Sequence, residues 1–347
     1  MKETKASASL EPLKNAPRLL MQAELKPAQG DRFQPTGFAD LGAAVYERPD
    51  GMRMLLVETA QSMANRLEHT CLDGDGPMIA RELEGLPYIL VTLKGQIETK
   101  TSSLVEAHRV NSPFIISDDK FKRMFMEKAG YAKGLPLDWK RIGNALFTLD
   151  PNSLLHGVFM ANLEDGRIKI PRAITGFIEA EDVCEAASGG VKNNPLDPTG
   201  MIRAESYDKD VYGNVPYHRM EYTAGRITAY FNFDLAVLDG YGLAPEARGL
   251  LVVLGLYKIR CFLDGGLRLR TACDLVLKGD VKSQVPEGFT LPDKGSLLAA
   301  VKNGIRTCTE KGLFARPPLT ELTTKVVLKG EEKQKTEGVP PETENSE

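Results

Sequence analysis

The chain has 347 residues, of which 42% are hydrophobic and 26% charged, as in ordinary globular proteins. Its start lacks the apolar run of a secretion signal and no segment is apolar enough to span a bilayer, so we expect a cytoplasmic protein without a membrane partner. The net charge of −3 argues against a simple basic nucleic-acid binder. However, residues 331–347 hold six glutamates and two lysines, so residues 1–330 sum to +1.

Patterns for metal or cofactor chemistry are missing from the sequence. The five cysteines are scattered without a C-x-x-C pair, so we expect no zinc site and interpret them as small buried residues of a reducing compartment. No phosphate-binding loop, dinucleotide fingerprint, serine-hydrolase elbow or H-E-x-x-H helix occurs. We therefore expect no cofactor, no metal and no catalytic residue. Turn chemistry explains the aspartates of the glycine-rich loops, which are Asp31, Asp40, Asp73 and Asp75.

The two ends of the chain differ in character from its middle. Residues 1–16 and 329–347 are polar and are predicted to be disordered, the latter as an acidic tail. One folded domain is predicted between them, over residues 17–328. It begins with a strand over residues 18–26, whose apolar and polar side chains alternate.

A second apolar strand, residues 52–57, leads into a helix that begins near Glu58. Apolar residues recur there at i, i+3, i+4 and i+7, which predicts one buried stripe. Ser62, Asn65 and Arg66 occupy the opposite side of the helix. That side combines a hydroxyl, an amide and a guanidinium group and is not simply a row of charges.

The middle of the chain mixes strand and helix patterns. A strand is predicted over residues 87–93, and residues 100–150 read as a helical insertion that starts with SLVEAHRV, residues 103–110. Further strands are predicted over residues 153–163 and 168–180. They are joined by a glycine-containing turn.

The last third of the chain supplies the clearest patterns. Residues 184–217 are rich in glycine, proline and asparagine and predict a long functional loop or extended hairpin. Residues 226–238 alternate as a strand, a buried helix starts at Pro245, and another strand covers residues 267–277. This order predicts an α+β fold, a modified RRM-like (ferredoxin-like) antiparallel sheet with helices and large insertions.

Basic side chains follow glycines at two places. Gly265 and Gly266 precede Arg268 and Arg270, which suits phosphate binding, although a helix cap followed by a solvated edge strand explains the same residues. The loop SGGVKNN offers one lysine and two amides. It could contact a nucleic acid or a neighbouring subunit, or be a variable surface loop.

Histidine is the usual acid and base of RNA-cleaving enzymes, but nothing in the sequence brings the histidines together. His108 lies in the helical insertion. His156 lies in a predicted apolar strand, where a hydrogen-bonded core histidine is the simpler interpretation. His218, followed by Arg219, is the better candidate for an RNA contact. Tyr230 lies on the polar face of its strand and could stack on a base, although the RRM aromatic signature is absent.

Several longer strings are more specific than these motifs. They are RLLMQAELKPAQGDRFQPTGFADLGAAVYERPDG, MLLVETAQSMANRLE, LLHGVFMANL, IPRAITGFIEAEDV, SGGVKNN, HRMEYTAGRITAYFNFDL and LDGGLRLRTACDL. With them the chain resembles the CRISPR-associated RAMP proteins of type I-U (also called I-G) systems, the Cas-seven backbone family of Cascade-like complexes. The resemblance spans nearly the whole folded region.

The resemblance implies a palm, a helical finger-like insertion and a hairpin thumb-like insertion. It implies a non-catalytic subunit whose copies stack head to tail along a CRISPR guide RNA (crRNA) and present it to target DNA in antiviral defence. Other partners would be a large subunit and a Cas-five or Cas-six type subunit. The palm would comprise residues 17–95, 151–183 and 219–328, the finger-like insertion residues 96–150, and the thumb-like insertion residues 184–218.

The resemblance also implies which side chains bind the guide. Such a backbone holds sugar and phosphate groups and leaves the base edges free. Lys192 and Asn193 would belong to the thumb. The full set of candidate RNA-binding residues is Arg32, Gln34, Thr36, Ser62, Asn65, Arg66, Arg172, Lys192, Asn193, His218, Arg219, Arg268 and Arg270.

Two other functions stay open at this point. Related backbone subunits of type III systems cut RNA with an aspartate of the thumb loop, and Asp197 lies near that place, so an endoribonuclease is the alternative. Its Leu-Asp-Pro setting is typical of a turn. A protein-interaction scaffold without RNA contact is the third reading.

Overall fold

The residues that the computed structural model describes are 10–38, 40–205 and 213–328. Of the ends predicted to be disordered, residues 1–9 and 329–347 lie outside this description. The prediction is wrong for residues 10–16, because Glu11–Leu13 form a short 3-10 helix (η1) and Leu13 is buried in the core.

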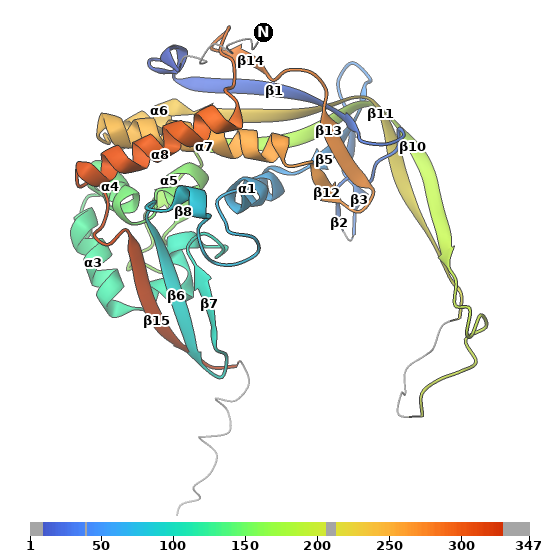
Figure 1. The fold of residues 1–347 in the computed structure, drawn as a ribbon, viewed down its shortest axis with the longest axis horizontal. Coiled ribbons are helices and arrows are strands. Elements are labelled where there is room, and N and C mark those ends of the chain that lie inside the picture. The colour runs from blue at the N-terminus through green and yellow to red at the C-terminus, as the bar shows by residue number, and fades with distance from the viewer. Residues whose placement is uncertain (1–9, 39, 206–212, 329–347) are drawn as a thin grey trace, which may run out of the picture.

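A curved antiparallel sheet runs across the top of the molecule in Figure 1. Its strands follow the order β12-β13-β1-β11-β10-β5-β4, and β14 pairs separately with β1. The bounds are β1 (Arg18–Pro27), β4 (Val45–Glu47), β5 (Arg53–Glu58), β10 (Ile174–Lys192), β11 (Val215–Asp234), β12 (Arg268–Arg270), β13 (Cys273–Leu277) and β14 (Lys282–Val285).

Four of these strands and two helices have the ferredoxin-like order. Along the chain, β1, α1 (Ala60–His69), β10, β11, α7 (Pro245–Asp264) and β13 follow one another, and their strands lie side by side as β13-β1-β11-β10. This is the β-α-β-β-α-β pattern, in which the fourth strand lies beside the first. The predicted α+β, RRM-like class is confirmed.

The alternation of β1 explains how the sheet meets its helices. Leu19 and Met21 are buried and lie opposite the buried Phe233 and Phe231 of β11. These side chains share one face of the sheet, because successive residues of a strand point to opposite faces. A Cβ added to Gly255 of α7 would lie 2.5 Å from the Phe233 ring, so glycine permits the close approach of this helix.

A second sheet of order β15-β6-β7 lies apart from the first. The strand predicted over residues 87–93 exists as β6, and it pairs with β15 and β7 in this second sheet rather than with the strands of the first sheet. The predicted finger-like insertion contains β7, η3 and α2 to α4.

The remaining bounds are β6 (Tyr88–Gly95), β7 (Thr99–Ser102), β15 (Leu319–Val326), η2 (Arg81–Leu83), η3 (Arg109–Asn111), α2 (Pro113–Ile116), α3 (Asp119–Ala129), α4 (Trp139–Leu149), α5 (Asn152–His156), α6 (Leu235–Gly240), α8 (Lys294–Glu310), β2 (Gly37–Phe38), β3 (Gly42–Ala43), β8 (Val158–Phe159) and β9 (Lys169–Ile170).

Several predicted elements differ from the structure, and three of them show why. Residues 103–108 form turns rather than the predicted helix, and only the short 3-10 helix η3 follows at Arg109, whose φ of 50° is left-handed. Residues 153–163 were predicted as a strand, but α5 and the two-residue β8 occupy them, since a short buried apolar run does not distinguish a helix from a strand. Residues 267–277 form the two strands β12 and β13, which a turn joins at Ala272 with φ 58°.

The long segment from residue 184 is an extended hairpin, one of the two forms we predicted. β10 and β11 stay paired from Ile174 and Phe233 out to Lys192 and Val215, and Figure 1 shows them reaching far beyond the sheet as a two-stranded arm. No helix in the described part of the chain is long and apolar enough to cross a membrane.

Candidate nucleic-acid interface

A buried carboxylate organises the polar side of α1. Glu58 ends β5 and is fully buried. Thr59 caps the helix by accepting a hydrogen bond from the Ser62 backbone N–H at 3.1 Å. Glu58 accepts hydrogen bonds from Ser62 Oγ, from Arg66 Nε at 2.8 Å and from the Arg270 guanidinium. The structure thus brings the predicted residues Ser62, Arg66 and Arg270 together around Glu58. The sequence analysis did not identify Glu58 as part of the site.

The two guanidinium groups of this cluster are fixed in place. Arg66 also donates to the Leu269 carbonyl at 2.5 Å, and Arg270 donates to the Gln34 carbonyl at 3.1 Å. Two positive charges surround one carboxylate, so the cluster keeps a net charge of +1. Side chains that are already ordered lose little conformational freedom when they bind an anion.

A second buried carboxylate repeats this arrangement on β11. Glu221 accepts hydrogen bonds from Arg219 Nε at 2.8 Å and lies 3.7 Å from Arg32 Nε. Phe33 and Tyr222 exchange backbone hydrogen bonds of 2.9 Å, which hold the Arg32 loop against the strand. Here too, two arginines share one carboxylate.

Two hollows connect these clusters into one surface, which we call the Arg268 groove. Their volumes are about 690 and 530 Å³, and Arg268 lines both. Its side chain is 71% exposed and lies 3.7 Å from Asp274. The polar lining residues of the Arg268 groove are Gln29, Asp31, Arg32, Ser62, Asn65, Arg66, His69, Thr70, Ser188, Arg219, Glu221, Arg268 and Asp274.

Two predicted residues support the groove without lining it. The Gln34 N–H donates to the Ala272 carbonyl at 2.8 Å, and the Thr36 N–H donates to the Val57 carbonyl at 3.1 Å. Gln34 Oε1 is buried and has no hydrogen-bond partner within the described residues. The backbone of this loop therefore fixes its position beside β5 and β13.

The arm carries three predicted residues away from the groove. Lys192 and Asn193 are exposed at its far end, and His218 is exposed opposite Gly189. Arg219 lies opposite Ser188, and both residues line the groove at the base of the arm. The structure therefore separates the predicted site into a groove part and an arm part.

Asp197 has the hydrogen bonds of a turn. Its carboxylate accepts from the N–H groups of Ile202 at 2.7 Å and Met201 at 2.9 Å. Those backbone hydrogen bonds lower the pKa of Asp197. Both carboxylate oxygens are thus engaged, as the turn interpretation requires.

The structure also shows the surroundings of Tyr230 and of two histidines outside the arm, His156 and His108. The Tyr230 ring stacks on Phe177 with centroids 5.0 Å apart. His156 is fully buried and hydrogen-bonded, as predicted for a core histidine, although it ends helix α5 instead of lying in a strand. His108 is exposed in a turn.

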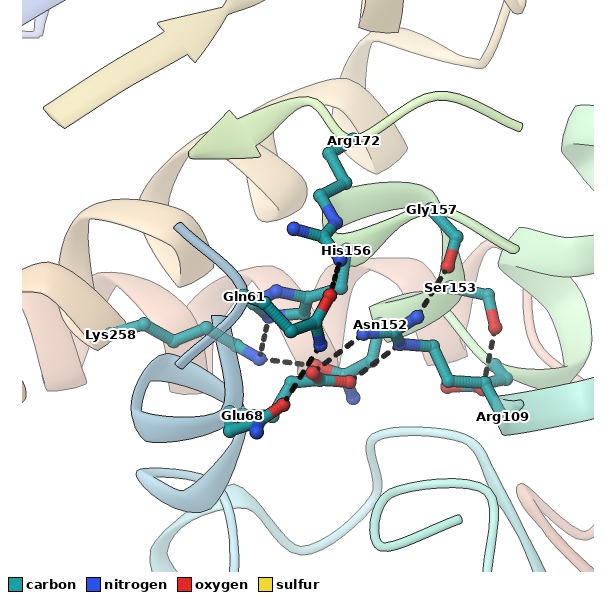
Figure 2. A network of polar contacts seen from close by, with 11 residues as sticks. Gln61, Glu68, Arg109, Asn152, Ser153, His156, Gly157, Arg172 and Lys258 are labelled. Carbon is teal, nitrogen blue, oxygen red and sulfur yellow. Dashed lines mark hydrogen bonds and ion pairs between the residues drawn. The ribbon is translucent and has the colours of Figure 1, made fainter. Parts of the chain in front are cut away.

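A second polar network, largely buried, joins α1 to η3, α5 and α7 (Figure 2). Lys258 of α7 is fully buried, with Nζ 2.6 Å from Asn152 Oδ1 and 2.9 Å from His156 Nε2. Arg109 forms two 2.6 Å bonds with Glu68. The sequence signal for these residues was weak, because a lone lysine in an apolar helix pattern does not reveal its partners.

Arg172 belongs to this inner network rather than to the Arg268 groove. Figure 2 shows its side chain extending toward His156 and Gln61, and it donates to Gln61 Oε1. Burial, and next the charge of Arg109, lower the pKa of Arg172. The predicted RNA-binding set thus falls on three separate parts of the molecule.

Metal ligands do not gather in the part of the chain that the structure describes, where no group of three His, Cys, Asp or Glu residues could hold an ion. All five cysteines are free thiols. The interpretation of all five as buried is wrong for Cys184, which is exposed on the arm, and Cys261 is half-buried.

One protein-family model matches part of the chain. The model of the family described as CRISPR-associated protein GSU0053 matches residues 19–185, from β1 into β10. Over this stretch, just under half of its length, the chain is similar to a CRISPR-associated family. The sequence resemblance to a CRISPR-associated RAMP protein is thereby confirmed. No curated protein matches the chain in sequence.

Solved structures that resemble the chain share little of its sequence. One chain, from "CRISPR RNA-guided surveillance complex, pre-nicking", has 12% identity and a TM-score of 0.40, and the match covers 77% of this chain and 75% of that one. Another, "Crystal structure of Thermofilum pendens Csc2", has 10% identity and a TM-score of 0.30, with coverages of 87% and 78%. At these TM-scores the likenesses support no conclusion about fold or function.

Proposed function

We propose that this CRISPR-associated protein is the crRNA-binding backbone subunit of a type I-U/I-G Cascade surveillance complex. Several copies stack head to tail along one guide and present it for pairing with target DNA. The observation that carries the proposal is the Arg268 groove, in which an exposed arginine lies between two arginine pairs, each held by a buried carboxylate.

The chemistry of the groove suits a sugar-phosphate chain. Guanidinium groups donate two parallel hydrogen bonds to phosphate oxygens, and hydroxyl and amide groups such as Ser62 and Asn65 can bond to riboses. Because the arginines are fixed before binding, phosphate contacts cost little ordering of side chains. A guide held by its backbone keeps its base edges free, which is what pairing with target DNA requires.

The modest charge of the groove is compatible with a repeated subunit. Four arginines face three carboxylates along its lining. Each copy needs few phosphate contacts, since contacts between copies and multivalent attachment to one RNA supply the rest of the affinity. The other partners are a large subunit and a Cas-five or Cas-six type subunit.

The proposed role is non-catalytic. Asp197, the candidate of an endoribonuclease, has both carboxylate oxygens occupied by turn N–H groups. We expect no regularly spaced cuts when the assembled complex is incubated with labelled complementary RNA and Mg²⁺. Cuts that appear in the wild type and disappear in Asp197→Ala would establish the endoribonuclease instead.

A binding titration tests the groove. Arg268→Gln and Arg32→Gln remove charge at exposed positions, and Lys302→Gln on the outer face of α8 is the matched control. Measured by fluorescence anisotropy with labelled single-stranded RNA, each groove variant should bind more weakly. Each should also lower the slope of log affinity against log salt by about 0.7 per lost phosphate contact. Equal affinities and slopes in all four proteins would contradict the proposal.

A further inference from the structure

A hollow of about 650 Å³ opens where η3, β8 and β9 meet, separate from the Arg268 groove. None of the described residues that line it carries a carboxylate, whereas three carry a positive charge. The lining residues that matter for its chemistry are Arg109, His156, Phe159, Lys169 and Arg172.

The histidine of this hollow presents an unused donor. Lys258 Nζ lies 2.9 Å from His156 Nε2, and an ammonium group only donates, so Nε2 accepts and the ring proton sits on Nδ1. Burial, and next the charge of Lys258, hold the pKa of His156 well below its usual value, which keeps the ring neutral. Nδ1 is buried and lacks a hydrogen-bond partner among the described residues. A buried N–H without an acceptor is costly, so an acceptor from a ligand would stabilise this site.

Two cations of the hollow lack a carboxylate partner in the described chain. Arg109 is different, because its guanidinium is bound by Glu68 and donates to the Gly157 carbonyl at 2.9 Å. Arg172 donates only to the neutral Gln61. Lys169 makes no ion pair there, and its Nζ lies 4.8 Å from the centroid of the Phe159 ring. Uncompensated cations and the His156 donor therefore favour an anionic ligand.

The exposed ring of Phe159 indicates which class of anion would bind. Phe159 is 49% exposed beside Lys169, although large apolar side chains are normally covered. An exposed ring beside basic groups is the arrangement with which proteins bind single-stranded nucleic acids, because bases stack on the ring while phosphates meet the cations.

The hollow is also connected to the surface of α1. A smaller hollow of about 370 Å³ shares Arg109 with it and shares Asn65 and His69 with the Arg268 groove. A strand that follows the groove along α1 can therefore continue to Phe159.

We propose that this hollow, the Phe159 site, binds one nucleotide of a single RNA strand. Its phosphate oxygens accept hydrogen bonds from Arg172, Lys169 and the His156 Nδ1–H, and its base stacks on the Phe159 ring. The inference rests on the proposed function, since it extends the RNA path beyond the Arg268 groove.

Ring-specific variants of the full chain test the Phe159 site. Phe159→Ala should weaken binding of a fluorescein-labelled single-stranded RNA by about 5- to 100-fold, as expected for loss of one stacked base. Phe159→Tyr, which keeps the ring, should bind within about twofold of the wild type. Lys169→Gln should lower the salt slope by about 0.7, and Lys302→Gln should not. Photocrosslinking with RNA that contains 4-thiouridine should attach the RNA to the wild-type peptide that contains Phe159.

The outcomes separate this inference from the proposed function. The Phe159 site would be overturned if Phe159→Ala and Lys169→Gln kept the wild-type affinity and salt slope while Arg268→Gln bound RNA more weakly. The Arg268 groove would then remain supported. Normal RNA binding with loss of association between copies, measured by sedimentation velocity, would make the hollow a protein-docking surface and also overturn it. A wild-type protein that binds no RNA would contradict both.

Discussion

The Arg268 groove and the Phe159 site both concentrate positive charge, but they differ in how that charge is balanced. In the groove, the buried Glu58 and Glu221 each bind two arginines. At the Phe159 site, Arg172 donates to the neutral Gln61 and Lys169 lies over the Phe159 ring, and neither forms an ion pair with a carboxylate of the described chain. Arginines of the groove therefore stabilise the fold as well as the proposed RNA contacts, whereas the inner cations are left for a ligand to neutralise.

The largest effect that would test this comparison concerns Glu58. Glu58→Gln leaves Arg66 and Arg270 without their carboxylate, and breaking a buried ion pair on one side costs about 3–5 kcal/mol. Chemical denaturation should show this fall in the free energy of unfolding. The control Glu185→Gln breaks an exposed pair with Arg53 and should leave the unfolding midpoint unchanged. A midpoint equal to that of the control would show that Glu58 does not anchor the groove.

A second effect concerns a buried carboxylate without a bound arginine. Burial raises the pKa of Asp150 from 3.8 to about 6, while its hydrogen bond with Ser153 offsets this in part. The folded state then holds a proton that the unfolded state releases near pH 4, so stability falls as pH rises from about 4 to 6. Asp150→Asn should remove about 3 kcal/mol of that fall, since each unit of pKa shift corresponds to about 1.4 kcal/mol.

Denaturation at several pH values measures this effect. The difference in unfolding free energy between Asp150→Asn and the wild type should grow in favour of the variant across the pH 4 to 6 window. Parallel stability curves for the two proteins would show that Asp150 is ionised like an ordinary aspartate.

The smallest effect on stability is expected on the arm. Lys192 and Asn193 are exposed at its far end, and their side chains form no hydrogen bond or ion pair with the residues that the structure describes. Lys192→Gln with Asn193→Ala should leave the melting temperature unchanged and weaken RNA binding by about threefold, as expected for one lost phosphate contact. Calorimetry and anisotropy separate the two quantities. A lower melting temperature with normal RNA binding would make these residues structural.

Local patterns predicted the parts of the fold that depend on neighbours in sequence. The period-two alternation of β1 and β11 and the amphipathic stripe of α1 were correct because each pattern is set within one element. The same local reasoning misplaced residues 153–156, whose side chains are buried on all sides and show no period. It also missed the break at Arg109, which depends on tertiary contacts with Glu68.

The site was predictable only in part. The side chains of α1 and β12 were found from their types and spacing, but the residues that hold them were not. Glu58 and Arg270 are 212 positions apart, and Lys258 and His156 are 102 apart, so no sequence window contains both partners. The roles of Lys192, Asn193 and His218 stay predictions, because the arm carries them away from the groove.

The central claim is that this protein binds a guide RNA through the sugar-phosphate backbone of the RNA. The most direct measurement is the nucleic acid that copurifies with the full chain after coexpression with a CRISPR repeat-spacer array, followed by extraction and sequencing. The account predicts discrete repeat-spacer RNA in the wild type and less of it in Arg268→Gln. Protein that is folded, by the same criteria as the Lys302→Gln control, yet free of nucleic acid would contradict it.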